Sequence, residues 1–242
     1  MGAKVKTGID GLDKMLNGGL VEGRNILLSG PCGSGKTTLA MQFVYNGAVD
    51  YGEPGLFMSL EEKPEKVIQD MGNFGIDVKK AMASGKLYVV GGPLAGLKSF
   101  MMKVDGNLDD VLLELRDIIK EHKVKRVAID STNLFTAFVH DEETKRRSLA
   151  ALCNSLSATG CTSMLTSETN EGALQLSRLG IEEFVVDGVI ALYLARQGSR
   201  FVPGIAVRKM RGAKHDKEIR YYEITDKGIS VYPEETMFTE IK

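Results

Sequence analysis

Lys36 and Thr37 close a glycine-rich stretch whose residue types suit the binding of phosphate. The stretch reads NILLSGPCGSGKTT, in which Gly-x-x-x-x-Gly-Lys-Thr lies between an apolar, strand-like run and a segment with helical apolar spacing. Glycines let backbone N–H groups turn toward phosphate oxygens, and the following helix presents the positive end of its dipole. The pattern predicts a P-loop, with Lys36 at the β- and γ-phosphates of a nucleotide and the Thr37 hydroxyl on Mg²⁺. The residues predicted to bind the nucleotide here are Gly30, Pro31, Cys32, Gly33, Ser34, Gly35, Lys36, Thr37 and Thr38.

Carboxylates end two further apolar runs. Asp130 ends the run in KVKRVAIDS, at the strand end where ligands bind in α/β sheets. We therefore predict that the Asp130 carboxylate is a second protein group, besides Thr37, that holds the metal. Glu61 and Glu62 end the run in GLFMSLEEKPEKV, where one carboxylate can align an attacking water while the other supports it. This arrangement predicts hydrolysis. The alternative is an acidic start to the helix after Pro64, since helix N-termini favour glutamate.

Strand and helix patterns alternate along the chain and must position these groups. Amphipathic helices are predicted over 108–123 and 144–160, each followed by an apolar strand. Beyond them, short strand candidates separated by glycine or charged turns predict an antiparallel extension. No linker or repeat interrupts the pattern, so we expect one α/β domain over residues 1–242, with a mainly parallel central sheet flanked by helices. The strand candidates of the extension lie at 187–198, 201–210, 217–225 and 228–233.

Composition restricts the possible partners and location. The net charge of −1 gives no overall field for nucleic acid or an anionic membrane, so any phosphate recognition must be local. No signal peptide is recognisable at the first residues, and no apolar run approaches the roughly 20 residues of a membrane helix. We therefore expect a soluble cytoplasmic protein. The cysteines, Cys32, Cys153 and Cys161, lack metal-binding spacing, which argues against zinc and a disulfide framework.

A cationic stretch, VRKMRGAKH at residues 207–215, contrasts with the nearly neutral net charge of the chain. Lys209 and Arg211 alternate on a strand-like segment, so both side chains project from one face and can bind one phosphate together. Arg208 points to the other face and Lys214 lies in a turn, so neither is assigned to a site. The alternative for the whole stretch is a solvated basic strand end.

The order of these motifs resembles, over nearly the whole chain, one repeat of the KaiC family within the RecA/RadA/DnaB superfamily of P-loop NTPases. The matching stretches are TGIDGLDKMLNGGLVEGRNILLSGPCGSGKTTLAMQFVYNG, EPGLFMSLEEKP, RVAIDS, GIEEFVVDGV and KMRGAKHDKEIRYYEITDKGI. The resemblance implies a RecA-like core, ATP and Mg²⁺ as ligands, and hexameric rings with ATP at each subunit interface.

Site residues carry over position by position. Glu61 and Glu62 match the glutamates that activate water, and Asp130 matches the Walker B acid. The resemblance further implies that Lys209 and Arg211 act in trans on the γ-phosphate held by the adjacent subunit, as an arginine finger. The positions implied to reach a neighbour's nucleotide are Lys209, Met210, Arg211 and His215.

The chain also departs from the family pattern. KaiC carries two such repeats, and this chain carries one. The repeat that phosphorylates itself has a Ser-Thr pair where this chain has Glu182, Glu183 and Phe184, which argues against autokinase activity. Ser167 and Thr169 are the nearest hydroxyls, and their location predicts sensing or strand-end hydrogen bonds. The clock partners of KaiC dock partly on the second repeat and tail, so the sequence gives no evidence that this chain binds them. Any protein partner stays unidentified.

Two other classes of function stay open. A DNA-binding recombinase or helicase core would carry basic and aromatic loops after its central strands. Here the corresponding segment, 167–188, contains one arginine, Arg178, against five acidic residues, although the loop at 91–106 adds Lys98 and Lys103. The other class is a slow, nucleotide-dependent scaffold for a protein partner. We rank the regulatory ATPase first, the scaffold second and the DNA motor third.

Overall fold

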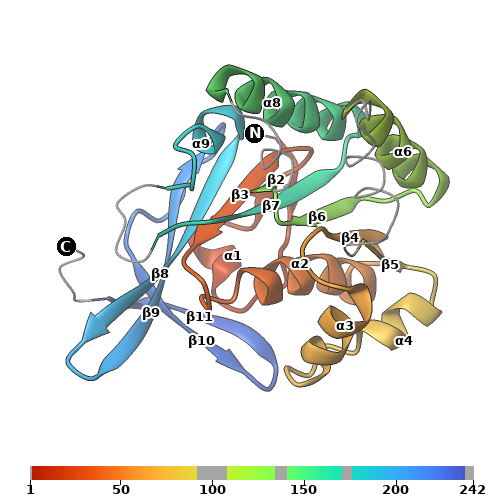
Figure 1. Cartoon of the computed structure of the whole chain (residues 1–242). Coiled ribbons are helices and arrows are strands. Elements are labelled where there is room, and N and C mark those ends of the chain that lie inside the picture. Colours follow the sequence, from red (N-terminus) through yellow and green to blue (C-terminus); the bar gives the residue numbers. More distant parts are fainter. Residues whose placement is uncertain (1, 92–107, 134–140, 171–175, 238–242) are drawn as a thin grey trace.

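A nine-stranded sheet organises the chain in the computed structural model, which describes residues 2–91, 108–133, 141–170 and 176–237 (Figure 1). The strand order is β11-β10-β9-β8-β3-β7-β6-β4-β5. Six strands from β8 to β5 in this order run parallel. Their bounds are β3 (Asn25–Gly30), β4 (Gly55–Ser59), β5 (Leu87–Gly91), β6 (Arg126–Asp130), β7 (Thr162–Glu168) and β8 (Gly188–Gln197).

The C-terminal strands extend the sheet in the antiparallel sense. β9 (Arg200–Met210) pairs with β8, β10 (Arg220–Thr225) pairs with β9, and β11 (Gly228–Thr236) closes this side. The predicted fold class, a RecA-like parallel core with a C-terminal antiparallel extension, is therefore confirmed. The edge strand β5 was not predicted from the sequence.

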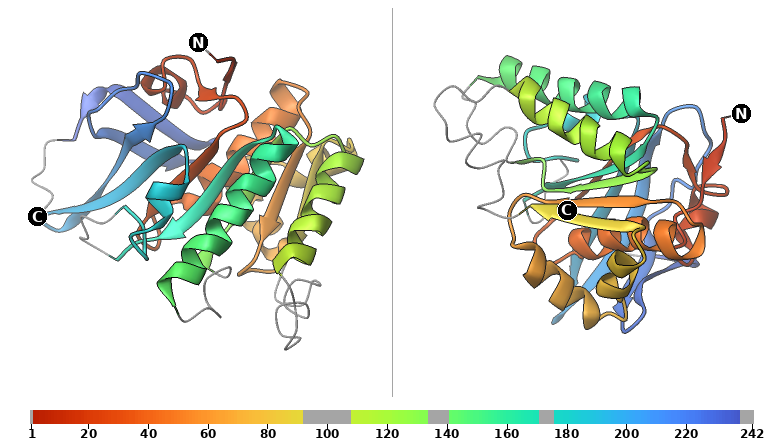
Figure 2. Two further views of the ribbon diagram at one scale, coloured as in Figure 1. Left: turned by 90° about the horizontal axis from the view of Figure 1, so that it is seen from above. Right: turned by 90° about the vertical axis from the view of Figure 1, so that its right-hand side faces the viewer.

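Helices cover both faces of the sheet. Figure 2 shows α6 (Leu108–Glu121) and α8 (Glu142–Thr159) on one face, and α2 (Lys36–Asp50), α3 (Pro64–Gly72) and α4 (Val78–Ala83) on the other. The short elements are α1 (Leu12–Met15), α9 (Glu182–Val185), β1 (Lys4–Val5) and β2 (Leu20–Val21), with β1 and β2 forming a separate two-stranded sheet.

Alternate residues of each central strand enter two separate cores. Along β3, Ile26 and Leu28 pack on the α2 side, whereas Leu27 packs on the α6 and α8 side. In β7, Met164 and Leu165 divide in the same way. Because neighbouring side chains of a strand point to opposite faces, a strand covered on both sides reads as one continuous apolar run. This explains why NILL and RVAI gave clear strand signals.

The antiparallel extension packs directly against the P-loop helix. The Gln42 side chain on α2 donates to the Ile229 carbonyl at 3.3 Å and accepts from the Ile229 N–H at 2.8 Å. Tyr222 of β10 is fully buried in the same core. The extension therefore supports the start of α2, and with it the loop that precedes this helix.

Two predictions from composition can be compared with the fold. All three cysteines are free; Cys153 and Cys161 are buried and Cys32 is exposed, and burial raises the pKa of Cys153 to about 12. Within the described ranges, no helix is both long and apolar enough to cross a membrane.

Candidate functional site

The loop between β3 and α2 has the backbone conformation that its glycines predict. Gly33 and Gly35 have φ angles of 77° and 83°, a left-handed region that favours glycine. The Ser34 hydroxyl donates to the Pro31 carbonyl at 2.7 Å and ties the loop to itself. The loop then runs into α2, whose N-terminus can face an anion.

Lys36 lies at the centre of the loop. Its Nζ donates to the carbonyls of Gly30 and Pro31, both at 2.9 Å. Burial lowers the pKa of Lys36, while the carboxylates of Glu168 and Asp130 oppose that shift. The Lys36 ammonium group therefore lies between two carbonyls of its own loop and the carboxylates at the ends of β6 and β7.

Thr37 and Asp130 meet as the sequence predicts for a metal site. The Thr37 hydroxyl donates to Asp130 Oδ2 at 2.7 Å, and Thr166 of β7 donates to Asp130 Oδ1 at 2.5 Å. A hydroxyl and a carboxylate are hard oxygen ligands that fit Mg²⁺, which retains several waters and needs few protein ligands. In the described part of the chain, no cluster of three or more His, Cys, Asp or Glu side chains is arranged for a metal.

The paired glutamates have different surroundings. Glu61 accepts a hydrogen bond from the hydroxyl of Ser131, which is 4% exposed and directly follows Asp130. Glu62 pairs instead with Lys66 of α3 at 2.7 Å, and its side chain is 44% exposed. Both line the same cavity, but Glu61 is directed toward the end of β6. The helix-start alternative thus describes Glu62 better than Glu61.

These groups surround one cavity of about 400 Å³ at the carboxyl edge of the sheet. Its polar side includes Lys36, Thr37 and Asp130. Its apolar lining residues are Met71 and Phe74, in and just after α3, and Ile224 of β10. The cavity therefore offers polar groups to a phosphate chain and apolar side chains to a ring system.

Several residues of the site were not assigned from the sequence. Ser131 was visible in the motif AIDS, but nothing in the pattern shows that its hydroxyl contacts Glu61. Glu168 also lines the cavity and lies 3.9 Å from Arg178. Tyr222 donates to the Ser34 carbonyl at 2.6 Å, across 188 residues of sequence. Only the fold brings β10 to the P-loop.

The predicted cations of β9 lie elsewhere. Lys209 Nζ donates to the carbonyls of Glu183 and Val186 at 2.7 Å, and Arg211 donates to the Phe184 carbonyl at 3.3 Å. Both residues thus contact the α9 segment, consistent with side chains on one face. Arg211 also lies 3.7 Å from the carboxylate of Asp187.

Strand register puts these cations at the amino edge of the sheet. Lys209 pairs with Val189 in β8, and Val189 pairs with Leu27 near the start of β3. The P-loop begins at Gly30, three residues or about 10 Å farther along the strand. Figure 1 shows α9 and the start of α2 at opposite ends of β3. The sequence-predicted site residues therefore form two groups that one chain does not bring together.

Met210 and His215 differ from their neighbours in the cationic stretch. The Met210 side chain is 6% exposed and packs in the core beside Gly188 and Ile26, so it is not directed outward as a nucleotide contact would require. The resemblance implied that Met210 reaches a neighbour's nucleotide, but its side chain packs against apolar residues under β9. The His215 ring, through Nδ1, lies 2.8 Å from the Asp216 carbonyl and is half-buried.

The strand-end hydroxyls have structural partners. Ser167 donates to Glu182 at 3.1 Å, and the Thr169 N–H donates to the Gly30 carbonyl at 3.0 Å. Glu182 is 3% exposed. The Glu182–Phe184 segment thus contributes a buried carboxylate that secures the end of β7.

Comparison with known proteins matches this chain to one family over most of its length. Residues 5–236 match the family model described as "ATPase: KaiC". The chain is 36% identical to the circadian clock oscillator protein KaiC of Synechococcus elongatus over 234 residues, which is 96% of this chain and 44% of that protein. It therefore spans less than half the length of that relative.

Other relatives have the same length as this chain. A UPF0273 protein of Pyrococcus horikoshii is 37% identical over 243 residues, covering 98% of this chain and 97% of its own. A UPF0273 protein of Thermotoga maritima is 37% identical over 239 residues, covering 96% and 97%. Single-repeat architecture is thus found among the relatives.

Proposed function

The chain belongs to the KaiC ATPase family, and on that basis we propose that it is a single-domain, Mg²⁺-dependent ATPase that assembles into a ring. The observation that carries the proposal is the convergence of Lys36, Thr37, Asp130 and Glu61 on one cavity beside β3. ATP is the proposed substrate, and the cytoplasm is the proposed location.

The residues of the cavity have distinct roles in this proposal. Lys36 and the backbone N–H groups of the loop bind the phosphates, while Thr37 and Asp130 hold the metal. Bound Mg²⁺–ATP supplies the phosphoanhydride to be cleaved and neutralises charge on its phosphates. Glu61 orients the attacking water and accepts its proton, and the Ser131 hydroxyl positions Glu61 for this step.

The separation of the two groups of site residues supports the proposed ring. Lys209 and Arg211 lie at the edge of the sheet opposite their own P-loop, so a role at a γ-phosphate requires the P-loop of another copy. A hexamer with ATP at each interface would bring the two edges together. The finger then acts in trans, and each interface responds to its own nucleotide.

A binding experiment tests the P-loop assignment. Lys36→Ala removes the ammonium group of the loop and should abolish most binding of a fluorescent ATP analogue while the protein remains folded by circular dichroism. Lys79→Ala, on the exposed side of α4, is the matched control and should bind as the unmodified protein does. Undiminished binding by folded Lys36→Ala protein would rule out this site.

The DNA-motor alternative has less support in the described residues. Arg178, the arginine of the segment after β7, faces Glu168 at 3.9 Å. Lys98, Lys103 and most of the loop predicted at 91–106 lie outside the described residues. A gel shift with single- and double-stranded DNA over a salt series separates this function from the ATPase and from the scaffold.

A further inference from the structure

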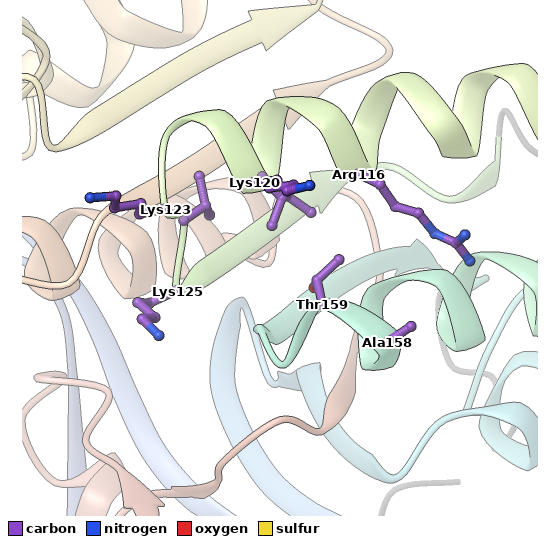
Figure 3. Close-up of a pocket in the computed structure, with 8 residues that line it drawn as sticks. Arg116, Lys120, Lys123, Lys125, Ala158 and Thr159 are labelled. Carbon is purple, nitrogen blue, oxygen red and sulfur yellow. The ribbon is translucent and has the colours of Figure 1, made fainter.

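A second cavity of about 520 Å³ lies between the C-terminal ends of α6 and α8, at the amino edge of the sheet. Figure 3 shows Arg116 extending from α6 toward α8, with Lys123 and Lys125 at the other end of the cavity. Lys120 lies between them on α6. The cavity is separate from the proposed ATP site and shares no lining residue with it.

The charges in this cavity are all of one sign. Four of its eight lining residues are cationic and none is acidic. Within the described residues, none of the four takes part in an ion pair, although Arg24, Lys66, Arg126, Arg147, Arg178, Arg211 and Arg220 all do. Arg116 and Lys120 are four apart on one helix, where like charges repel. An anion would relieve this repulsion.

Arg116 is oriented for such an anion. Its Nε donates at 2.8 Å to the hydroxyl of Ser155, which is 1% exposed. Within the described ranges, its two Nη groups have no hydrogen-bond partner. A planar guanidinium held by one nitrogen presents the other two as a fork that matches phosphate oxygens.

The inner wall of the cavity is apolar and held in place. Ile119 and Val124 are 3% and 4% exposed. The Val124 N–H donates to the Ile119 carbonyl at 2.9 Å, and the Cys161 thiol donates to the Val124 carbonyl at 3.0 Å. The carbonyl ends of α6 and α8 attract cations here, but Lys125 lies just before β6 and Arg116 lies more than a turn before the end of α6.

We propose that this cavity binds a small phosphomonoester with an apolar or aromatic body. Arg116 and Lys120, which are neighbours on one face of α6, bind the phosphate, and Ile119, Val124 and Ala158 contact the body. The volume lies within the range of small-molecule sites. A dianionic phosphate suits these cations better than a single carboxylate does, because each added charge gains from every neighbouring cation.

Isothermal titration calorimetry with 1-naphthyl phosphate and inorganic phosphate tests this proposal. The titrations use Lys36→Ala protein, in which the P-loop does not compete for phosphate. The site variant adds Arg116→Gln and Lys120→Gln. The matched control adds Lys145→Gln and Arg146→Gln, which remove the same charge near the start of α8.

Naphthyl phosphate should bind at least about fivefold more tightly than inorganic phosphate. The site variant should weaken its binding about tenfold or more, and the control should change it less than about twofold. Equal weakening by both variants would show that binding depends only on general charge attraction, and would overturn the proposal. The proposal would also be overturned if naphthyl phosphate did not bind, or if a DNA duplex bound more tightly and its binding required Arg116 and Lys120.

Discussion

At the carboxyl edge of the sheet, Lys36 faces carboxylates across one cavity, whereas at the amino edge Lys209 and Arg211 bond mainly to backbone carbonyls. The first group contains the proposed phosphate-binding loop, the proposed metal ligands Thr37 and Asp130, and Glu61 within one chain. The second group contains the two proposed finger residues, which do not line the cavity of the proposed nucleotide site. In the proposed function, phosphoryl transfer needs both groups.

Most partners of the cations at the amino edge are neutral backbone carbonyls, besides the Asp187 carboxylate near Arg211. Burial and the nearby Arg211 charge lower the pKa of Lys209, while Asp187 and Glu183 raise it. A neutral carbonyl binds an ammonium group less strongly than an anion does, so a phosphate can replace it. In the proposed ring, a second copy of this chain would supply that phosphate.

Removing the cations of the amino edge should have the largest effect. Lys209→Ala with Arg211→Ala should lower the rate of ATP hydrolysis on the order of 10³-fold, because a charge-stabilising finger is lost. Arg208→Ala with Lys214→Ala removes the same charge from the same stretch and should change the rate less than about threefold. Similar losses in both variants, measured by phosphate release, would contradict a specific finger.

A smaller effect should distinguish the two glutamates of the carboxyl edge. Glutamine keeps the shape of glutamate but does not accept a proton, so Glu61→Gln should lower the hydrolysis rate on the order of 10²-fold while retaining bound ATP. Glu62→Gln should lower it less than about fivefold, because Glu62 pairs with Lys66. Steady-state kinetics of both variants checks this order, and the reverse order would move the role of base to Glu62.

The smallest effect should come from the contact between the extension and the loop. Tyr222→Phe leaves the buried Ser34 carbonyl without its donor and should lower the free energy of unfolding by about 1–3 kcal/mol. Tyr221→Phe is the control, because its hydroxyl bonds to Glu223 at the half-exposed face of the same strand. Chemical denaturation measures both. Equal stability of the two variants would show that the Tyr222 hydroxyl does not support the loop.

The sequence predicted the fold class and most central strands, because local patterns encode them: NILL and RVAI are continuous apolar runs. Lys36 and Thr37 were found through a spaced motif, and with Asp130 they line one cavity, while their roles stay predictions. The sequence did not predict the β5 strand, the contact of Ser131 with Glu61, or the bond from Tyr222 to Ser34. Such contacts join segments far apart in the chain, and neither residue type nor spacing indicates them.

The amino edge shows the same limit. Alternation along β9 predicted that Lys209 and Arg211 share a face, but it did not show that their contacts are the carbonyls of α9. The packing of the Met210 side chain into the core was also not predicted. The topology that sets the cations at the far end of β3 from the P-loop appears only in the strand order and register.

Mixing two inactive variants tests most directly whether the two edges act across subunits. One variant carries Lys209→Ala and Arg211→Ala, and the other carries Glu61→Gln. Where subunits exchange, some interfaces would join an intact finger to an intact acid, and ATPase activity should rise well above that of either variant alone. No recovery, in mixed rings verified by native mass spectrometry, would contradict an action of Lys209 and Arg211 in trans.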